Sequence, residues 1–152
     1  MRIRAAHPDE AGFLSDLAVR GKEYWGYDAD FLRDCRPQLA VWPDEVESRR
    51  VTVAEVDGVV VGFYSLEGGP PAGVLGLMFV EPGRIRSGIG RRLWDHAVAT
   101  ARDAGLAEFT IDSEPFAEPF YLAMGAVWTG SIPSSLRPGR ELPHLTFTVA
   151  SG

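Results

Sequence analysis

The sequence predicts a mixed α/β domain whose sheet is mostly antiparallel. Two β-branched runs, residues 50–56 and 59–66, are joined by Asp57-Gly58, the strongest short signal for a β-hairpin. A third run, residues 73–80, follows a Gly-Gly-Pro-Pro turn, so the three runs predict a meander. Residues 88–105 then place apolar and charged side chains on opposite halves of a helix. A sheet with interleaved helices follows from this order.

The chain before the hairpin predicts one short strand and two helices. Residues 3–5 alternate in polarity, and Pro8 with its acidic neighbours opens a helix that extends to about Arg20. A second short helix around Phe31 is expected to end before Pro37, because proline lacks the N–H that a helix interior needs.

The chain after residue 105 completes the sheet. We expect a fifth strand at residues 107–111, a short helix at 116–124, and closing strands at 126–129 and 144–149. With 152 residues, one domain spanning 1–152 is expected.

Composition excludes several classes of partner. The net charge of −6 and the pI near 5.0 argue against nucleic acid, which needs a basic surface. No apolar run approaches the roughly 20 residues that span a bilayer, so no membrane partner is expected. The single cysteine, Cys35, fits a reducing cytoplasm. The three histidines lack partners at metal-ligand spacing, so we expect no metal and treat each as a surface or boundary residue.

The link from the meander to the long helix carries the main functional signal. Gly88 and Gly90 allow close approach of the backbone, and free N–H groups at a helix start bind anions. Four arginines surround this point in an acidic chain. The link lacks the Lys-Ser/Thr of a Walker loop, and Leu93 replaces the third glycine of a dinucleotide fingerprint. We therefore predict a pyrophosphate site formed mainly by backbone.

This link resembles the acyl-CoA loop of the GNAT N-acetyltransferases, Arg/Gln-x-x-Gly-x-Gly/Ala. Gly88-Ile89-Gly90-Arg91 matches its end and Val80-x-Pro82 matches the preceding strand end, whereas Ile85 stands where many members have Arg or Gln. Residues 117–126 resemble the second signature, Ala-x-x-Phe-Tyr-x-x-x-Gly-Phe, with Ala126 in place of the final Phe. The resemblance covers about residues 51–127.

The resemblance implies the GNAT fold, with a mostly antiparallel sheet that splays between its fourth and fifth strands and is flanked by helices. It implies an N-acetyltransferase that uses acetyl-CoA as cosubstrate and acts on a primary amine of a small molecule or peptide by direct attack. Pantetheine would lie along Met78, Phe79 and Val80. The pyrophosphate would contact the glycine loop, whose expected cofactor-binding residues are Arg84, Arg86, Ser87, Gly88, Ile89, Gly90 and Arg91.

Tyr121 occupies the position where family members place the acid that protonates the leaving thiolate. The general base stays open, because the strand at 73–80 has no carboxylate. Asp112 and Glu114 are the nearest candidates, although each also fits the start of the next helix, and a water chain is a third alternative.

The acceptor site is expected at residues 23–28. Three aromatic residues lie there beside acids, a composition that suits a cationic amine, and we assign Trp25, Tyr27 and Asp28 to substrate binding. The loop at 131–140 is the alternative location. A CoA-binding sensor that kept the fold and lost the chemistry is the alternative function. Homodimers are common in the family, but no residue pattern marks one here.

Overall fold

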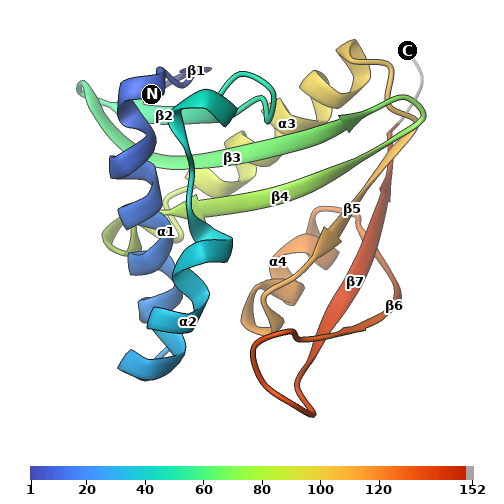
Figure 1. Ribbon diagram of the computed structural model, residues 1–152. Coiled ribbons are helices and arrows are strands. Elements are labelled where there is room, and N and C mark those ends of the chain that lie inside the picture. The colour runs from blue at the N-terminus through green and yellow to red at the C-terminus, as the bar shows by residue number, and fades with distance from the viewer. Residues whose placement is uncertain (150–152) are drawn as a thin grey trace.

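The computed structural model describes residues 1–149 and contains one seven-stranded sheet of order β1-β2-β3-β4-β5-β7-β6 (Figure 1). Every neighbouring pair is antiparallel except β4 and β5, which are parallel. The predicted fold class is confirmed. The strands are β1 (Arg2–Ala5), β2 (Thr52–Val56), β3 (Val59–Gly69), β4 (Ala72–Val80), β5 (Glu108–Asp112), β6 (Val127–Pro133) and β7 (Glu141–Thr148).

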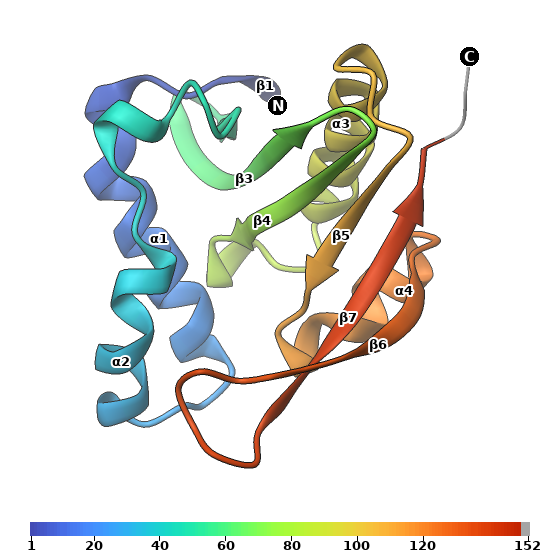
Figure 2. The ribbon, with the colours of Figure 1, turned by 45° about the vertical axis from the view of Figure 1, so that its right-hand side comes forward.

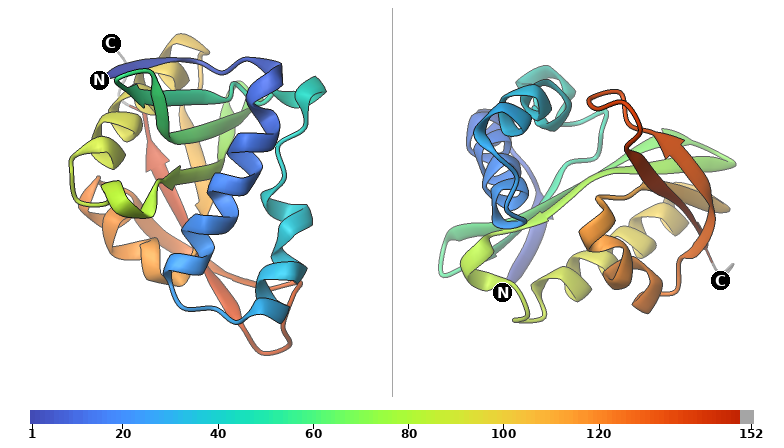
Figure 3. Two further views of the ribbon diagram at one scale, coloured as in Figure 1. Left: turned by 90° about the vertical axis from the view of Figure 1, so that its left-hand side faces the viewer. Right: turned by 90° about the horizontal axis from the view of Figure 1, so that it is seen from below.

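Helices cover both faces of the sheet (Figure 3). One face carries α1 (Ala11–Tyr24) and α2 (Ala29–Leu39), and the other carries α3 (Ile89–Asp103) and α4 (Glu118–Ala123). Successive strand residues point to opposite faces, so the sheet separates two apolar clusters. Four short 3₁₀ helices connect the elements: η1 (Pro8–Glu10), η2 (Pro43–Glu45), η3 (Pro82–Arg84) and η4 (Pro115–Ala117).

The predicted meander is present, and its first turn has the expected chemistry. Asp57 and Gly58 have φ angles of 51° and 79°, the left-handed pair that a tight hairpin turn requires. The long helix also forms as predicted, with Leu93, Trp94 and Ala97 buried against the sheet.

The expected end of the second helix is wrong. Helix α2 continues to Leu39 and contains Pro37. Pro37 lies in the last turn, where only one carbonyl, that of Arg33, loses its intrahelical donor. Burial of Phe31, Cys35 and Leu39 on one stripe stabilises the longer helix. Helix α1 begins later and ends later than predicted, at Ala11 and Tyr24, and the closing strands β6 and β7 are longer than predicted.

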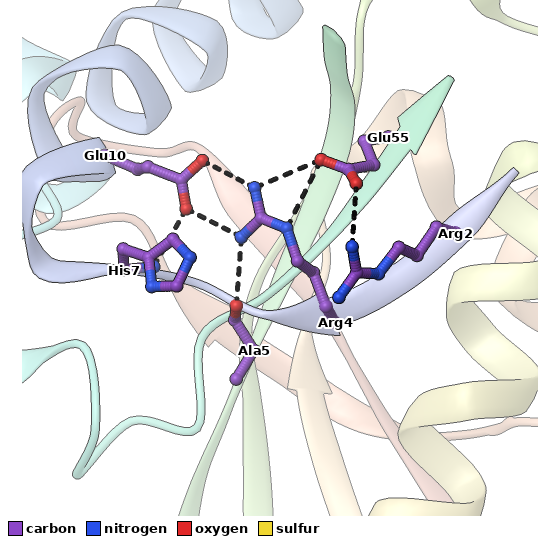
Figure 4. Close-up of polar contacts among 6 residues, drawn as sticks. All are labelled: Arg2, Arg4, Ala5, His7, Glu10 and Glu55. Atoms are coloured by element: carbon purple, nitrogen blue, oxygen red, sulfur yellow. Dashed lines mark hydrogen bonds and ion pairs between the residues drawn. The ribbon is translucent and has the colours of Figure 1, made fainter. Parts of the chain in front are cut away.

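A charged network joins β1 to β2 and η1 (Figure 4). The Arg4 guanidinium donates to both carboxylate oxygens of Glu10 at 2.9 Å and to Oε2 of Glu55 at 3.2 and 3.3 Å. The backbone N–H of His7 donates to Glu10 at 2.8 Å. Hydrogen bonding from Arg4 and His7 lowers the pKa of Glu10 to about 2. Arg4 therefore fixes the first strand to the start of the helical layer.

We expect Glu10→Gln to lower the free energy of unfolding at pH 7 by roughly 1.5 kcal/mol, since it removes a charged hydrogen-bond acceptor. A depressed pKa stabilises the fold above the ordinary value near 4.5, and this contribution declines as pH falls toward 2. Urea unfolding at several pH values should show the variant approaching the wild type below about pH 5. Glu23→Gln, at an exposed position, is the matched control. A difference that stays constant down to pH 3 contradicts the assignment.

Candidate active site

The parallel strands β4 and β5 separate soon after they start (Figure 2). Their pairing covers only residues 72–74 of β4 and 108–110 of β5. The register of β4 against β3 changes directly afterwards, from Leu66 opposite Leu75 to Ser65 opposite Leu77, which leaves Gly76 as a bulge. A bulge bends its strand, and here it lies where the splay opens. Within residues 1–149, β4 has no strand partner on its β5 side beyond Val74.

Gly76 at the bulge has a steric reason to be glycine. A Cβ there would lie 1.9 Å from Oε2 of Glu67, a β3 residue. Glu67 is held in place by the Ser65 hydroxyl at 3.0 Å and by Nη2 of Arg49 at 3.3 Å. The Glu67 carboxylate therefore packs against the bulge, where only glycine leaves room for it.

A cavity of about 980 Å³ occupies the splay. Its walls come from the free edge of β4, the glycine loop, the end of β5 with η4 and α4, the helices α1 and α2, and the β6–β7 loop. The cavity thus joins the predicted cofactor segments to both segments considered for the acceptor. The predicted site residues on its lining are Trp25, Met78, Phe79, Val80, Arg86, Gly88, Gly90, Arg91, Asp112 and Tyr121.

The glycine loop places a helix N-terminus at the cavity. Gly88 is the N-cap of α3 with φ 88°, and a Cβ at this position would meet no atom within 4 Å. Arg86 adopts φ 70°, which is uncommon for a residue with a side chain. At Gly90, a Cβ would lie 3.3 Å from the Phe120 ring, so glycine permits close packing of α3 on α4.

Three residues predicted to bind cofactor are not on the cavity wall. Ile89 is buried in the apolar cluster beneath α3. Ser87 donates its hydroxyl to the backbone carbonyl of Arg84 and so closes the turn before the helix. Arg84 lies on the exposed side of this turn. Of the predicted anion-binding groups, the glycines at the N-terminus of α3 and the residues Arg86 and Arg91 line the cavity.

Tyr121 lines the cavity from the α3/α4 side of the sheet. Its ring packs against those of Trp94 and Phe120, with centroids 5.9 and 5.3 Å away, and only 7% of the residue is exposed. Its hydroxyl makes no hydrogen bond to any other residue that the structure describes, and burial raises its pKa well above the usual range. The phenol is therefore protonated at neutral pH and has a proton to donate.

Asp112 lines the cavity from the opposite face. Ile111 packs into the cluster under α3 and α4, so strand alternation directs Asp112 toward α1 and α2. His144 lies directly across from Asp112 on β7, and its Nδ1 is 2.7 Å from Oδ1 of Asp112. A carboxylate–imidazole pair on this face can accept a proton and pass it to solvent.

Glu114 has a different environment. Its carboxylate is 2.5 Å from Nζ of Lys22 and 3.4 Å from Nη2 of Arg140, and it accepts a hydrogen bond from the Tyr27 hydroxyl. Burial, with the bond to Glu114, raises the pKa of Tyr27 to about 12. With the Phe116 N–H as a fourth partner, the carboxylate oxygens of Glu114 are fully engaged within the protein. Among the two carboxylates considered for the base, Asp112 is the less constrained.

The aromatic stretch closes one end of the cavity. The Trp25 ring stacks on Phe116 with centroids 5.5 Å apart and planes 15° from parallel. Asp28 is the N-cap of α2, and its Oδ1 accepts the Phe31 N–H at 2.8 Å. Tyr27 stacks on Phe31 at 4.4 Å. Trp25 thus lies on the wall, whereas Tyr27 and Asp28 hold the segment that presents it.

Sequence reasoning missed three polar residues of this site. Lys22 lies inside an ordinary amphipathic helix, and Arg140 lies in an irregular loop. His144 was predicted to be a surface or boundary residue, yet it pairs with Asp112. The pairing of β5 with β7 brings Asp112 and His144 together across 32 positions, and no local pattern signals that register.

Residues 1–149 contain neither a metal-ligand cluster nor a membrane-spanning helix. That part of the chain holds no cluster of three or more His, Cys, Asp or Glu side chains suited to a metal ion. It also has no helix both long and apolar enough to cross a membrane.

Comparison with protein families identifies the class. The family described as "Acetyltransferase (GNAT) domain" matches residues 29–132, more than half of the chain, and this span includes the glycine loop and Tyr121. The chain therefore belongs to the GNAT family of acetyltransferases. Membership of this family gives its activity class, that of an acyl-CoA-dependent N-acetyltransferase. No curated protein matches the chain in sequence.

Solved structures share the fold over nearly the whole chain. The PaiA N-acetyltransferase from Thermoplasma acidophilum, in complex with coenzyme A, is 14% identical with a TM-score of 0.78, covering 97% of this chain and 98% of its own. An aminoglycoside 6'-N-acetyltransferase complexed with coenzyme A is 18% identical, with a TM-score of 0.74 and coverage of 100% and 99%. The ribosomal-protein-S18-alanine N-acetyltransferase from Escherichia coli is 14% identical, with a TM-score of 0.72 and coverage of 99% and 95%.

Proposed function

We propose that this protein transfers an acetyl group from acetyl-CoA to a primary amine of a small molecule or peptide, by direct attack of the amine on the thioester. The observation that carries the proposal is the splay between β4 and β5, where Tyr121 and Asp112 line one cavity from opposite faces of the sheet. A thioester in the splay would have an acid on one side and a base on the other.

The cofactor would be held mainly by backbone. Pantetheine would pair with the free edge of β4 at Met78, Phe79 and Val80. The pyrophosphate would rest on the N-terminus of α3 at Gly88 and Gly90, where N–H groups and the helix dipole favour negative charge. Arg86 and Arg91 would add two cations, while Arg84, Ser87 and Ile89 would shape the turn rather than touch phosphate.

The reaction then requires the protonated amine to lose two protons and the thiolate to gain one. The acceptor amine has a pKa near 10, so it arrives protonated and loses its proton toward Asp112, which His144 orients. The amine lone pair forms the new C–N bond, and a β4 backbone N–H stabilises the oxyanion. The C–S bond breaks, and the thiolate takes the Tyr121 hydroxyl proton. The nitrogen then loses its second proton, which restores the Tyr121 phenol, and the proton held by Asp112 leaves to solvent. The products are an N-acetyl amide and free CoA thiol.

The acceptor would approach from the α1/α2 side. Trp25 would contact it directly, since its ring lies on the cavity wall against Phe116. Tyr27 and Asp28 would act by holding that wall, through Glu114 and the start of α2. One structural neighbour is named for an aminoglycoside and another for the alanine of a ribosomal protein. Candidate acceptors should therefore include both small molecules and peptides. We place the reaction in the cytoplasm, where the free thiol of Cys35 is stable.

Amine-dependent thiol release tests this function. Acetyl-CoA should yield free CoA thiol when polyamines, amino acids, aminoglycosides or peptides are screened, and the reacting amine should gain one acetyl group by mass spectrometry. If acetyl-CoA binds but no amine accelerates thiol release, the protein is a CoA-binding sensor instead.

A further inference from the structure

We infer that the acceptor is an amino acid with an apolar side chain, because a surplus of buried positive charge in the cavity calls for a carboxylate on the substrate. The inference rests on the proposed acetyl transfer and narrows its substrate class. This substrate class differs from the one suggested by the aromatic and acidic residues 23–28 alone, which is a cationic amine without a carboxylate.

The surplus charge comes from Lys22 and Arg140, which share Glu114 as their only acidic partner among residues 1–149. The side chains of Lys22, Arg140 and Glu114 are 14%, 20% and 9% exposed. Tyr27 is neutral in this cluster because its pKa is raised. Two cations and one anion leave one net positive charge in a partly desolvated site, which is costly unless a ligand supplies an anion.

Neighbouring charged groups do not remove this surplus. Asp112 is bonded to His144, and its side chain is 48% exposed. Arg137, in the same loop as Arg140, is neutralised by Asp34 at 2.8 Å. The acidic residues in and next to the aromatic stretch do not line the cavity: Glu23 is exposed, Asp28 caps α2, and the 77%-exposed Asp30 pairs with Arg33.

Both cations have donors left for a ligand. Lys22 uses one N–H on Glu114, and Arg140 uses Nη2 alone, on Tyr27 at 2.9 Å and on Glu114. Within residues 1–149, Nη1 and Nε of Arg140 have no hydrogen-bond partner, and neither is sealed from solvent. Both residues line the cavity. Arginine N–H pairs match carboxylate geometry, so Arg140 with Lys22 can bind an α-carboxylate.

The wall around this pair is apolar. Aromatic side chains form one end of this wall, and aliphatic side chains of α2 and of the β6–β7 segment form the rest. Such a surface suits an apolar side chain and disfavours polyamines and aminoglycosides, which carry several cations and little apolar surface. The apolar wall residues are Trp25, Phe31, Leu39, Phe116, Leu136 and Leu142.

A pair of product analogues tests the inference without requiring turnover. N-acetyl-L-phenylalanine and N-acetylphenethylamine differ only by the carboxylate. Calorimetric titration of the protein, free and loaded with CoA, should show the carboxylate ligand binding roughly 10- to 100-fold more tightly, the scale of hydrogen bonds to a charged group. Equal affinities, tighter binding of the neutral analogue, or no binding of either ligand would overturn the inference.

Three variants change the net charge of the cluster formed by Lys22, Arg140 and Glu114. Lys22→Met and Arg140→Met each leave a neutral pair with Glu114, so each should reduce the affinity ratio by about tenfold. Glu114→Gln raises the surplus of positive charge, so it should increase the ratio of affinities for the carboxylate and neutral analogues. Arg33→Met, an exposed arginine with the same change of charge, is the matched control and should leave the ratio unchanged. A ratio insensitive to Lys22, Arg140 and Glu114 in variants with native circular dichroism also overturns the inference.

Different results would refute acetyl transfer and the amino-acid substrate class. If the carboxylate ligand binds selectively but phenylalanine and other amines release no thiol from acetyl-CoA, acetyl transfer is refuted and a carboxylate-binding cavity remains. If thiol release occurs equally with phenylalanine and with phenethylamine, acetyl transfer stands and the amino-acid class is refuted.

Discussion

Tyr121→Phe should lower kcat by roughly 100-fold or more while the affinity for acetyl-CoA stays within a factor of about two. General acid catalysis contributes on this scale, and the substitution removes only a hydroxyl. The ring contacts with Trp94 and Phe120 are retained, so the fold should be unaffected. The hydroxyl has no other partner within residues 1–149, so its loss breaks no structural hydrogen bond.

Steady-state kinetics with a working amine, together with calorimetry of acetyl-CoA, would measure both effects. Tyr24→Phe removes a hydroxyl from an exposed tyrosine outside the cavity and serves as the control. Because burial keeps the phenol of Tyr121 protonated, the wild-type rate should not fall through loss of the acid anywhere between pH 6 and 9. A Tyr121→Phe enzyme with unchanged kcat would assign this tyrosine a packing role only.

Gly88→Val should weaken acetyl-CoA binding by roughly tenfold or more. At φ 88°, a β-branched residue is strained by an estimated 1–3 kcal/mol, and relief of that strain would move the N–H groups at the start of α3. The open space where the valine would sit is also where a phosphate would approach the helix. Since no protein atom is displaced, circular dichroism should stay native.

Gly83→Val provides a matched control a few residues earlier. A Cβ at Gly83 also meets no atom within 4 Å, but Gly83 does not have a left-handed φ and does not line the cavity. The Gly83→Val variant should bind acetyl-CoA with the same affinity as the wild type. If Gly88→Val and Gly83→Val bind acetyl-CoA equally well, the α3 N-terminus is not the pyrophosphate site.

The fold was predictable because its signals are local. Asp57-Gly58 specifies the hairpin turn, and the apolar half of α3 specifies which side packs on the sheet. The glycine loop was predictable for the same reason, since Gly88 needs its left-handed φ whatever the rest of the chain does. Element ends were less predictable. Pro37 marks a helix stop locally, yet burial of Leu39 extends α2 past it.

The acceptor side of the site was not predictable from local patterns. Its polar groups meet only through tertiary pairing: α1 contributes Lys22, the β5–η4 loop contributes Glu114, and the β6–β7 loop contributes Arg140. Composition of residues 23–28 located one wall of the cavity, whereas the charged residues Lys22 and Arg140 on the same cavity lie outside that stretch. The net charge around the cavity depends on which carboxylates already accept hydrogen bonds within the protein, as Asp28 accepts one from the Phe31 N–H. No local sequence pattern indicates these pairings.

The most direct test of the account is a crystal structure with a non-hydrolysable acetyl-CoA analogue. We predict the pyrophosphate at the N-terminus of α3, pantetheine along the free edge of β4, and the sulfur position within hydrogen-bond reach of the Tyr121 hydroxyl, with Asp112 across the splay. An analogue bound outside the gap between β4 and β5, or a sulfur position remote from Tyr121, would contradict it.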